Sequence, residues 1–126
     1  MIPKSTAKLK TGDYCLLPRA DGTSVIFAYL DSVSGSRSAL YGALLSPPML
    51  AKDSALPLQV RIAYKGLVHI SSYAENNTPI VGNVADLIGD SQIKEALSAC
   101  TDTSIGAVHA VIGHRALLRK AESVAA

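Results

Sequence analysis

The feature that most constrains the fold is the segment formed by residues 9–30, in which two apolar runs meet at Asp21-Gly22. A tight turn needs residues that tolerate positive φ, so Asp-Gly between β-prone runs is a strong hairpin signal. The two runs predict strands over residues 14–17 and 24–30. Residues 24–30 are apolar on both faces, and we therefore expect the second strand to lie inside a sheet.

Further strands follow in the middle of the chain. Residues 39–45 predict a third strand, and Gly42 within it implies a bulge or a close backbone approach. Residues 58–73 alternate between apolar and polar side chains, with a break at Gly66, which predicts a half-buried strand that resumes after the glycine. A short edge strand is expected over residues 80–82.

The last third of the chain changes from strand to helix patterns. Asp90 or Ser91 is a suitable N-cap for a helix that continues to Cys100. A second helix is expected over residues 103–123, although its two glycines leave a last strand over residues 105–112 as an alternative.

Strands first and helices last favour the α+β class. We expect a twisted antiparallel sheet or a small SH3-like, partly open barrel of about five to six strands, with one or two C-terminal helices. The 126 residues fit a single domain. Within it, residues 1–8 are expected to form a flexible basic tail, residues 9–82 a β-rich body and residues 90–123 a helical part.

The composition indicates a globular protein with few charges. The chain is 48% hydrophobic and 17% charged, and its net charge of +2 is far below what non-specific nucleic-acid binding demands. The start of the sequence has no apolar signal core, and no run approaches the length of a membrane span. We therefore expect a cytoplasmic protein without a membrane partner, in which Cys15 and Cys100 are reduced and buried rather than joined.

No motif in the sequence indicates catalysis. The three histidines, His69, His109 and His114, lack carboxylates or cysteines at metal-ligand spacing, so no metal is predicted. The serines are not set in a nucleophile elbow, and no glycine-rich phosphate loop or dinucleotide fingerprint occurs. We expect a protein that is not an enzyme and that needs no cofactor.

The tyrosines divide into two groups. Those in the strand pattern are expected in the core with hydrated hydroxyl groups. Tyr41, beside a glycine, and Tyr73, before a polar loop, are better candidates for a contact surface, because tyrosine is common in interface hot spots. The expected core tyrosines are Tyr14, Tyr29 and Tyr64, and the candidate partner-binding residues are Tyr41, Tyr73, Glu75, Asn76 and Asn77.

The order of motifs resembles the immunity protein 26 family of bacterial polymorphic toxin systems. That family opens with a hairpin of the pattern "GD, apolar, P, DG, apolar aromatic" and later shows a "viG" element. The likeness covers roughly residues 9–87. The matching residues here are Gly12, Asp13, Leu17, Pro18, Asp21, Gly22 and Phe27, followed by Ile80, Val81, Gly82 and Asn83.

The resemblance implies a protein that binds the C-terminal domain of a cognate toxin and blocks its active site or substrate path without doing chemistry. The alternative is a small β-barrel that binds nucleic acid, with basic residues on phosphates and a tyrosine stacked on bases. The residues for that alternative are Lys4, Lys8, Lys10, Arg19, Arg37 and Tyr41.

Overall fold

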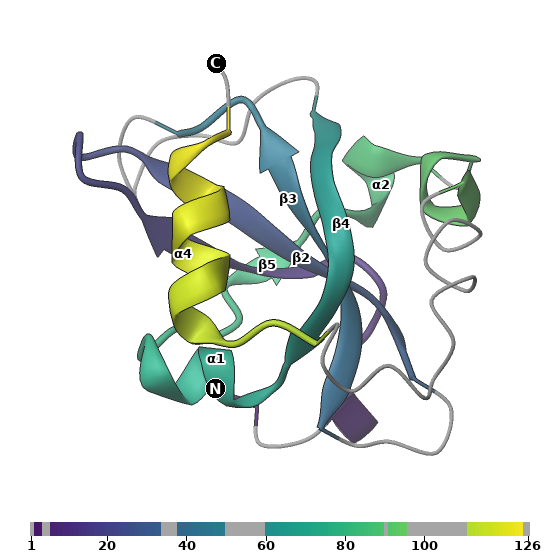
Figure 1. Cartoon of the computed structure of the whole chain (residues 1–126). Helices are drawn as coiled ribbons and strands as arrows, with labels where there is room; N and C mark the ends of the chain where they lie inside the picture. Colours follow the sequence, from purple (N-terminus) through teal and green to yellow (C-terminus); the bar gives the residue numbers. More distant parts are fainter. Residues whose placement is uncertain are drawn as a thin grey trace.

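The computed structural model describes residues 2–3, 6–33, 38–49, 60–89, 91–95 and 111–124 of the chain. These residues form an antiparallel sheet of five strands in the order β4-β3-β2-β1-β5, which is open rather than closed into a barrel (Figure 1). This confirms the predicted α+β class. The strands are β1 (Asp13–Pro18), β2 (Ser24–Ser32), β3 (Ala39–Ser46), β4 (Arg61–His69) and β5 (Gly82–Asn83).

The predicted opening hairpin is present. Gly22 has a φ of +88°, the left-handed conformation for which glycine is suited, and Asp21 accepts hydrogen bonds from the Thr23 amide and hydroxyl at 2.9 and 2.6 Å. The two strands pair with Cys15 opposite Phe27. Every residue from 25 to 30 is buried, which confirms the expected position of β2 inside the sheet.

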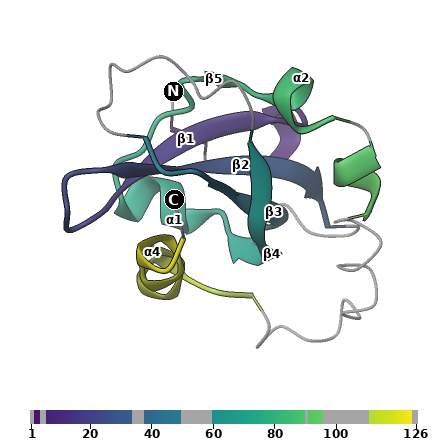
Figure 2. The ribbon, with the colours of Figure 1, turned by 90° about the horizontal axis from the view of Figure 1, so that it is seen from above.

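Helices lie on both faces of the sheet. The helices α1 (Ser71–Glu75) and α4 (His114–Glu122) cover one face, whereas α2 (Ala85–Ile88) and the helical residues 91–95 lie beyond the other (Figure 2). Each face has its own apolar cluster, because alternate side chains of β2 point to opposite sides. One cluster contains Ile26 and Ile88, and the other contains Phe27 and Leu117.

Gly42 is closely approached by a side chain and not, as expected, by another backbone segment. A Cβ atom there would lie 2.5 Å from Cε1 of the Phe27 ring, so the ring occupies the space of the missing side chain. Gly42 is paired directly with Gly66 on β4, and the sheet therefore has two adjacent positions without side chains.

Three expectations for the middle of the chain are wrong. The strand β4 runs without a break through Gly66, since that glycine pairs normally with β3. Tyr64 is 38% exposed instead of in the core, because β4 is the edge of the sheet and α4 covers only part of its face. After His69 the chain turns into α1, so residues 71–73 are helical where a strand was expected.

The expected edge strand forms at Gly82 and Asn83, where it pairs with β1. Residues 91–95 are helical as predicted, and the rest of that predicted helix lies outside the described residues. The predicted last helix is present as α4, which begins only after Gly113. Of the alternative strand, Ile112 forms a single parallel bridge with Val68, and residues 105–110 lie outside the described part.

The N-terminal segment, predicted as a flexible tail, makes contacts where it is described. Pro3 is buried, and Ile2 packs against the apolar cluster that contains Phe27. Residues Thr6–Lys8 form a turn of 3₁₀-helix, in which Ala7 and Lys8 are exposed.

Candidate functional site

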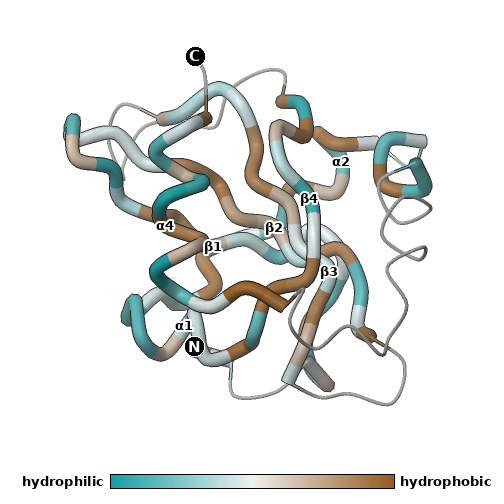
Figure 3. Tube along the Cα trace, in the orientation of Figure 1, coloured by the Kyte–Doolittle hydropathy of each residue, from teal (hydrophilic) through white to brown (hydrophobic). Residues whose placement is uncertain are grey.

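The sequence of α4 explains how it sits on the sheet. Its residues change between hydrophilic and hydrophobic along the helix, as in an amphipathic helix (Figure 3). Leu117 and Ala121 are 2% and 0% exposed and face the apolar cluster. Just before the helix, Ile112 donates its amide to the Leu67 carbonyl and accepts from the His69 amide, both at 3.0 Å. The start of α4 is thereby attached to the edge of β4.

The C-terminal end of α4 is attached to the opening hairpin by Arg19. The guanidinium Nη1 donates to the Val124 carbonyl at 2.6 Å, and the side chain lies 3.9 Å from the Glu122 carboxylate. The Glu122 carboxylate also accepts the Ala20 amide at 2.7 Å. Because both ends of the helix are held, the space between α4 and β4 has a fixed shape.

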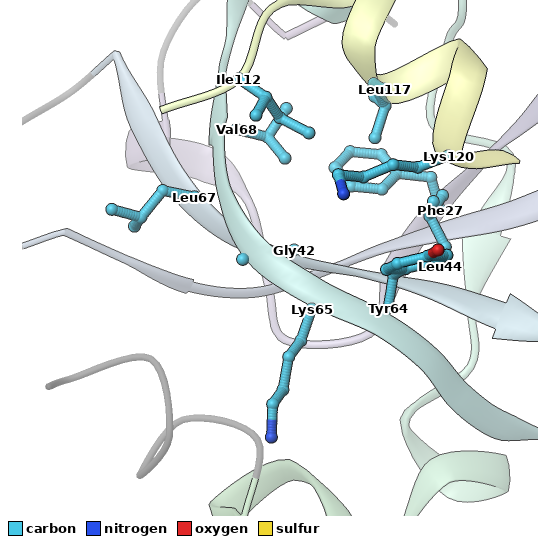
Figure 4. Close-up of a pocket in the computed structure, with 11 residues that line it drawn as sticks. Phe27, Gly42, Leu44, Tyr64, Lys65, Leu67, Val68, Ile112, Leu117 and Lys120 are labelled. Atoms are coloured by element: carbon cyan, nitrogen blue, oxygen red, sulfur yellow. The ribbon is translucent and has the colours of Figure 1, made fainter. Parts of the chain in front are cut away.

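A cleft of about 260 Å³ opens between α4 and the sheet (Figure 4). Its floor is the backbone at Gly42 and Gly66, and its walls are mostly aliphatic and aromatic. Concave, apolar sites with few polar groups are the usual form of binding sites on proteins. The lining residues are Phe27, Leu44, Tyr64, Lys65, Leu67, Val68, Ile112, Leu117 and Lys120, together with the two glycines.

The cleft exists because the space above only one of the two paired glycines, Gly42, is occupied by a neighbouring side chain. At Gly42 the Phe27 ring takes the place of a side chain, whereas a Cβ atom at Gly66 would meet no atom of the described residues within 4 Å. Any larger residue at position 66 would project into the cleft, since it lies on the same strand face as Tyr64 and Val68. The space left by the missing side chain at Gly66 is therefore part of the cleft.

One cation stands at the mouth of the cleft. The Lys120 Nζ lies 4.7 Å from the centroid of the Tyr64 ring, a cation–π contact. Lys65 contributes to the lining but extends to the other side of β4 (Figure 4). No ion pair joins Lys120 to a carboxylate within the described residues. Lys120 is therefore available to an anion at this mouth.

Positive charge is concentrated on the two elements that form the cleft. β4 and α4 carry five of the twelve basic residues of the chain and one of its ten acidic residues, Glu122. Arg115 and Arg119 are exposed and four residues apart, and neither has an ion-pair partner in the part of the chain that the structure describes. Of these five basic residues only Lys120 stands at the mouth of the cleft, because Arg61 and Lys65 line a hollow with Glu95, and Arg115 and Arg119 line a hollow beside Glu75.

Two of the five candidate contact residues are not on the surface. Tyr73 is 1% exposed and its ring packs against Phe27 with centroids 5.7 Å apart, and Tyr41 is 7% exposed in the opposite cluster. The prediction that these two residues contact a partner is wrong. The helical turn of α1 directs Tyr73 inward, and Tyr41 lies on β3, where every residue after Ala39 is buried.

Glu75, Asn76 and Asn77 form the end of α1 and the turn after it. Glu75 and Asn77 are exposed, Asn76 is half-buried, and Asn77 has a φ of +53°. Glu75 lines a second, open hollow of about 580 Å³ with Arg115 and Arg119 of α4. The contact role of these three residues stays a prediction, but the hollow places Glu75 beside the basic side of α4.

The residues of the nucleic-acid alternative do not gather on one surface. Lys8 and Lys10 are exposed, whereas Arg19 is engaged with the end of α4 and Tyr41 is buried. Lys4 and Arg37 lie outside the described residues. The exposed basic pair that the sequence analysis missed, Arg115 and Arg119, is on α4.

Cys15 is a buried free thiol in the core beneath α1. Burial raises the pKa of this thiol from 9.0 to about 12, and a hydrogen bond with Thr78 acts in the opposite direction. Burial also raises the pKa of the neighbouring Tyr73 hydroxyl, which has no hydrogen-bond partner among the described atoms. Neither group is placed to act on a ligand in the cleft. The location of Cys100 is outside the described residues.

The Cys15 pKa predicts a loss of stability at high pH. Between pH 9 and about 12 the folded chain keeps a proton that the unfolded chain has lost, so the free energy of unfolding falls as pH rises. The slope contributed by one such group approaches about 1.4 kcal/mol per pH unit, and the contribution is constant below pH 9. Urea unfolding at several pH values from 8 to 11 should show no contribution from this thiol up to about pH 9 and a progressive fall above it. The Cys15→Ala variant should have a shallower slope, and equal slopes would contradict the prediction.

Of the two described histidines, His69 makes local hydrogen bonds, whereas the Nδ1 atom of His114 has no hydrogen-bond partner among the described residues. His69 Nδ1 lies 2.7 Å from the Ser71 hydroxyl at the start of α1, and His114 is half-buried at the start of α4. Among the described residues no group of three histidine, cysteine or acidic side chains could hold a metal ion. His109 lies outside them.

No protein-family model, curated protein or solved structure matches the chain. Within the described residues, no helix has the length and apolar character needed to cross a membrane.

Proposed function

We propose that this chain is a binding protein of the immunity type, which attaches to a toxin domain and blocks it without doing chemistry. The observation that carries the proposal is the preformed cleft between β4 and α4, apolar within and basic at its mouth. Interface hot spots are commonly anchor side chains in such pockets, surrounded by polar contacts. The resemblance of residues 9–87 to immunity protein 26 supports the same class.

The exposed side of α4 is the contact surface in this proposal. It presents Arg115 and Arg119, with the cleft on one side and the hollow beside Glu75 on the other. A stable interface buries about 800 Å² on each protein, so the partner in this proposal covers α4 together with both depressions. The protein would then act in the cytoplasm of the cell that makes it, where it meets the incoming toxin.

The uncompensated arginines of α4 also favour a second candidate function, the binding of nucleic acid. Phosphates would pair with Arg115 and Arg119. The walls of the adjacent cleft favour a protein instead, since they are lined largely by hydrocarbon and the polar edges of an inserted base would lose their hydrogen bonds to water without replacement.

Co-expression tests the proposal directly. The chain is produced with the C-terminal domain of the exported protein encoded in the neighbouring reading frame, and growth and complex formation are measured. We expect restored growth and a complex that survives gel filtration. Charge reversal on α4, Arg115→Glu with Arg119→Glu, should weaken the complex, whereas reversal of the exposed Lys8 and Lys10 should leave it intact.

Two results would contradict the proposal. One is the absence of both complex and protection with the wild-type chain. The other is binding to an oligonucleotide that weakens steeply with salt and is lost in the α4 reversal variant, which would establish the second candidate instead.

A further inference from the structure

We propose that the cleft above Gly66 takes a single apolar side chain of the partner protein, and that Lys120 binds a carboxylate next to it on the same partner segment. This inference rests on the proposed function, and it adds the chemistry of the partner: an acidic segment with one aromatic or branched aliphatic anchor.

The volume of the cleft suits one large side chain. A dry cavity of about 150 Å³ holds a benzene molecule, and this cleft measures about 260 Å³. The volume therefore has room for a phenylalanine or leucine side chain with part of its backbone. The position next to Gly66 is open, because in the part of the chain that the structure describes no atom lies within 4 Å of where a Cβ atom would be.

The walls select an apolar group. Phe27, Leu44, Val68, Ile112 and Leu117 present hydrocarbon to the cleft from both the sheet and α4. When an apolar side chain of the partner moves from water onto this surface, the affinity of the complex increases with the apolar area that is buried. A polar group placed there would lose its hydrogen bonds to water without replacement.

Lys120 supplies the second half of the recognition. Its ammonium group contacts only the Tyr64 ring among the described residues, at 4.7 Å, and that ring is 38% exposed. A carboxylate of the partner beside the anchor would gain a charge-assisted hydrogen bond at the mouth of the cleft. Arg115 and Arg119 continue the positive surface along α4 beyond the cleft. That extension favours an acidic protein segment over a small carboxylate molecule.

Filling the cleft is the first arm of the test. Gly66→Val places a β-branched side chain in the vacant position, and the backbone at Gly66 is not in the left-handed conformation, so the variant should fold. Affinity for the toxin domain of the co-expression experiment is expected to fall about thirtyfold, the loss typical of a hot-spot anchor. Ala63→Val, at an exposed position of the same strand that does not line the cleft, should change it less than about twofold.

Removing the charge is the second arm. Lys120→Met keeps the unbranched side chain and removes the ammonium, and we expect about tenfold weaker binding at low salt. Lys94→Met is the matched control, because Lys94 is exposed on the helical residues 91–95 beyond the opposite face of the sheet.

The third arm uses the chain alone with small probes. 3-Phenylpropionate, at millimolar concentration, should shift the methyl signals of Val68, Ile112 and Leu117 in the wild type but not in Gly66→Val. Acetate lacks the apolar group and 3-phenylpropylamine has the opposite charge, so both should bind more weakly. Failure of 3-phenylpropionate to shift these signals would overturn the inference even if Gly66→Val did not fold.

The outcomes separate this inference from the proposed function. If the toxin domain binds Gly66→Val and Lys120→Met as tightly as the wild type, the inference is wrong and the proposed function stands. If the toxin domain does not bind the wild type at all, the proposed function fails. An oligonucleotide that binds the wild type and is lost in Gly66→Val would show that the cleft takes a base, and would overturn the inference.

Discussion

The Gly42→Ala variant is expected to lose about 1–3 kcal/mol of stability, the usual cost of an overpacked core. The new Cβ atom would lie 2.5 and 2.6 Å from two carbons of the Phe27 ring and 3.2 Å from a methyl carbon of Leu40. Phe27 is 1% exposed and packs on the Tyr73 ring, which limits its retreat on that side. The free direction for the ring is toward the cleft, so the variant should also have a smaller cleft.

Gly66 provides the matched control on the neighbouring strand. Gly66→Ala adds the same methyl group on the paired strand, at a position with no atom of the described ranges within 4 Å. This change should be neutral or should stabilise the fold by about 0.5–1 kcal/mol. Urea unfolding of both variants measures the two changes. Equal effects at the two glycines would show that the Phe27 ring does not occupy the space at Gly42, and that the cleft does not arise from a difference between Gly42 and Gly66.

The first half of the fold could be predicted because its signals are local. Asp21-Gly22 fixes a turn, and the apolar residues on both faces of β2 require a covered strand. Both features depend on residues close in sequence. The spacing of apolar residues near the C-terminus is a local signal too, and it predicts the helix that is found as α4.

The edge of the sheet was harder to predict because burial there depends on distant segments. The alternation through Tyr64 is a genuine strand pattern, yet β4 is the edge strand and α4 leaves Tyr64 partly open. Tyr73 resembles an exposed loop residue in the sequence, but the short helix α1 buries it. Alternation predicts which residues share a face, and it does not predict whether that face is covered.

The cleft was not predicted for a related reason. It requires Gly42 to face Gly66, and a pairing of residues so far apart is set by the register of β3 and β4. It also requires α4 to cross the sheet at that point, with Lys120 above Tyr64. The sequence signal that could have found it is the pair of glycines inside two consecutive strands, once a register had been assumed.

Truncation of Leu117 on α4 should have the largest effect on stability. This side chain is 2% exposed, packs in the cluster that contains Phe27 and forms one wall of the cleft. Leu117→Ala should lower the free energy of unfolding by about 2–5 kcal/mol, because it removes apolar contacts and leaves a cavity. That cavity can shrink only if α4 moves toward the sheet. The free energy of unfolding of a domain of this size is about 5–15 kcal/mol in total, so the variant should be close to unfolding in mild denaturant.

Arg115→Ala on the exposed side of α4 is the control, and it should change stability by less than about 0.5 kcal/mol. Urea unfolding gives both values, and hydrogen exchange reports whether α4 opens separately from the sheet. If the free energy of unfolding of Leu117→Ala is less than about 1 kcal/mol below that of the wild type, α4 is not firmly packed on the sheet. The cleft would then lack a fixed wall, because Leu117 and Lys120 reach it from the same helix. The stability of α4 and the shape of the proposed binding site are therefore tested by the same substitution.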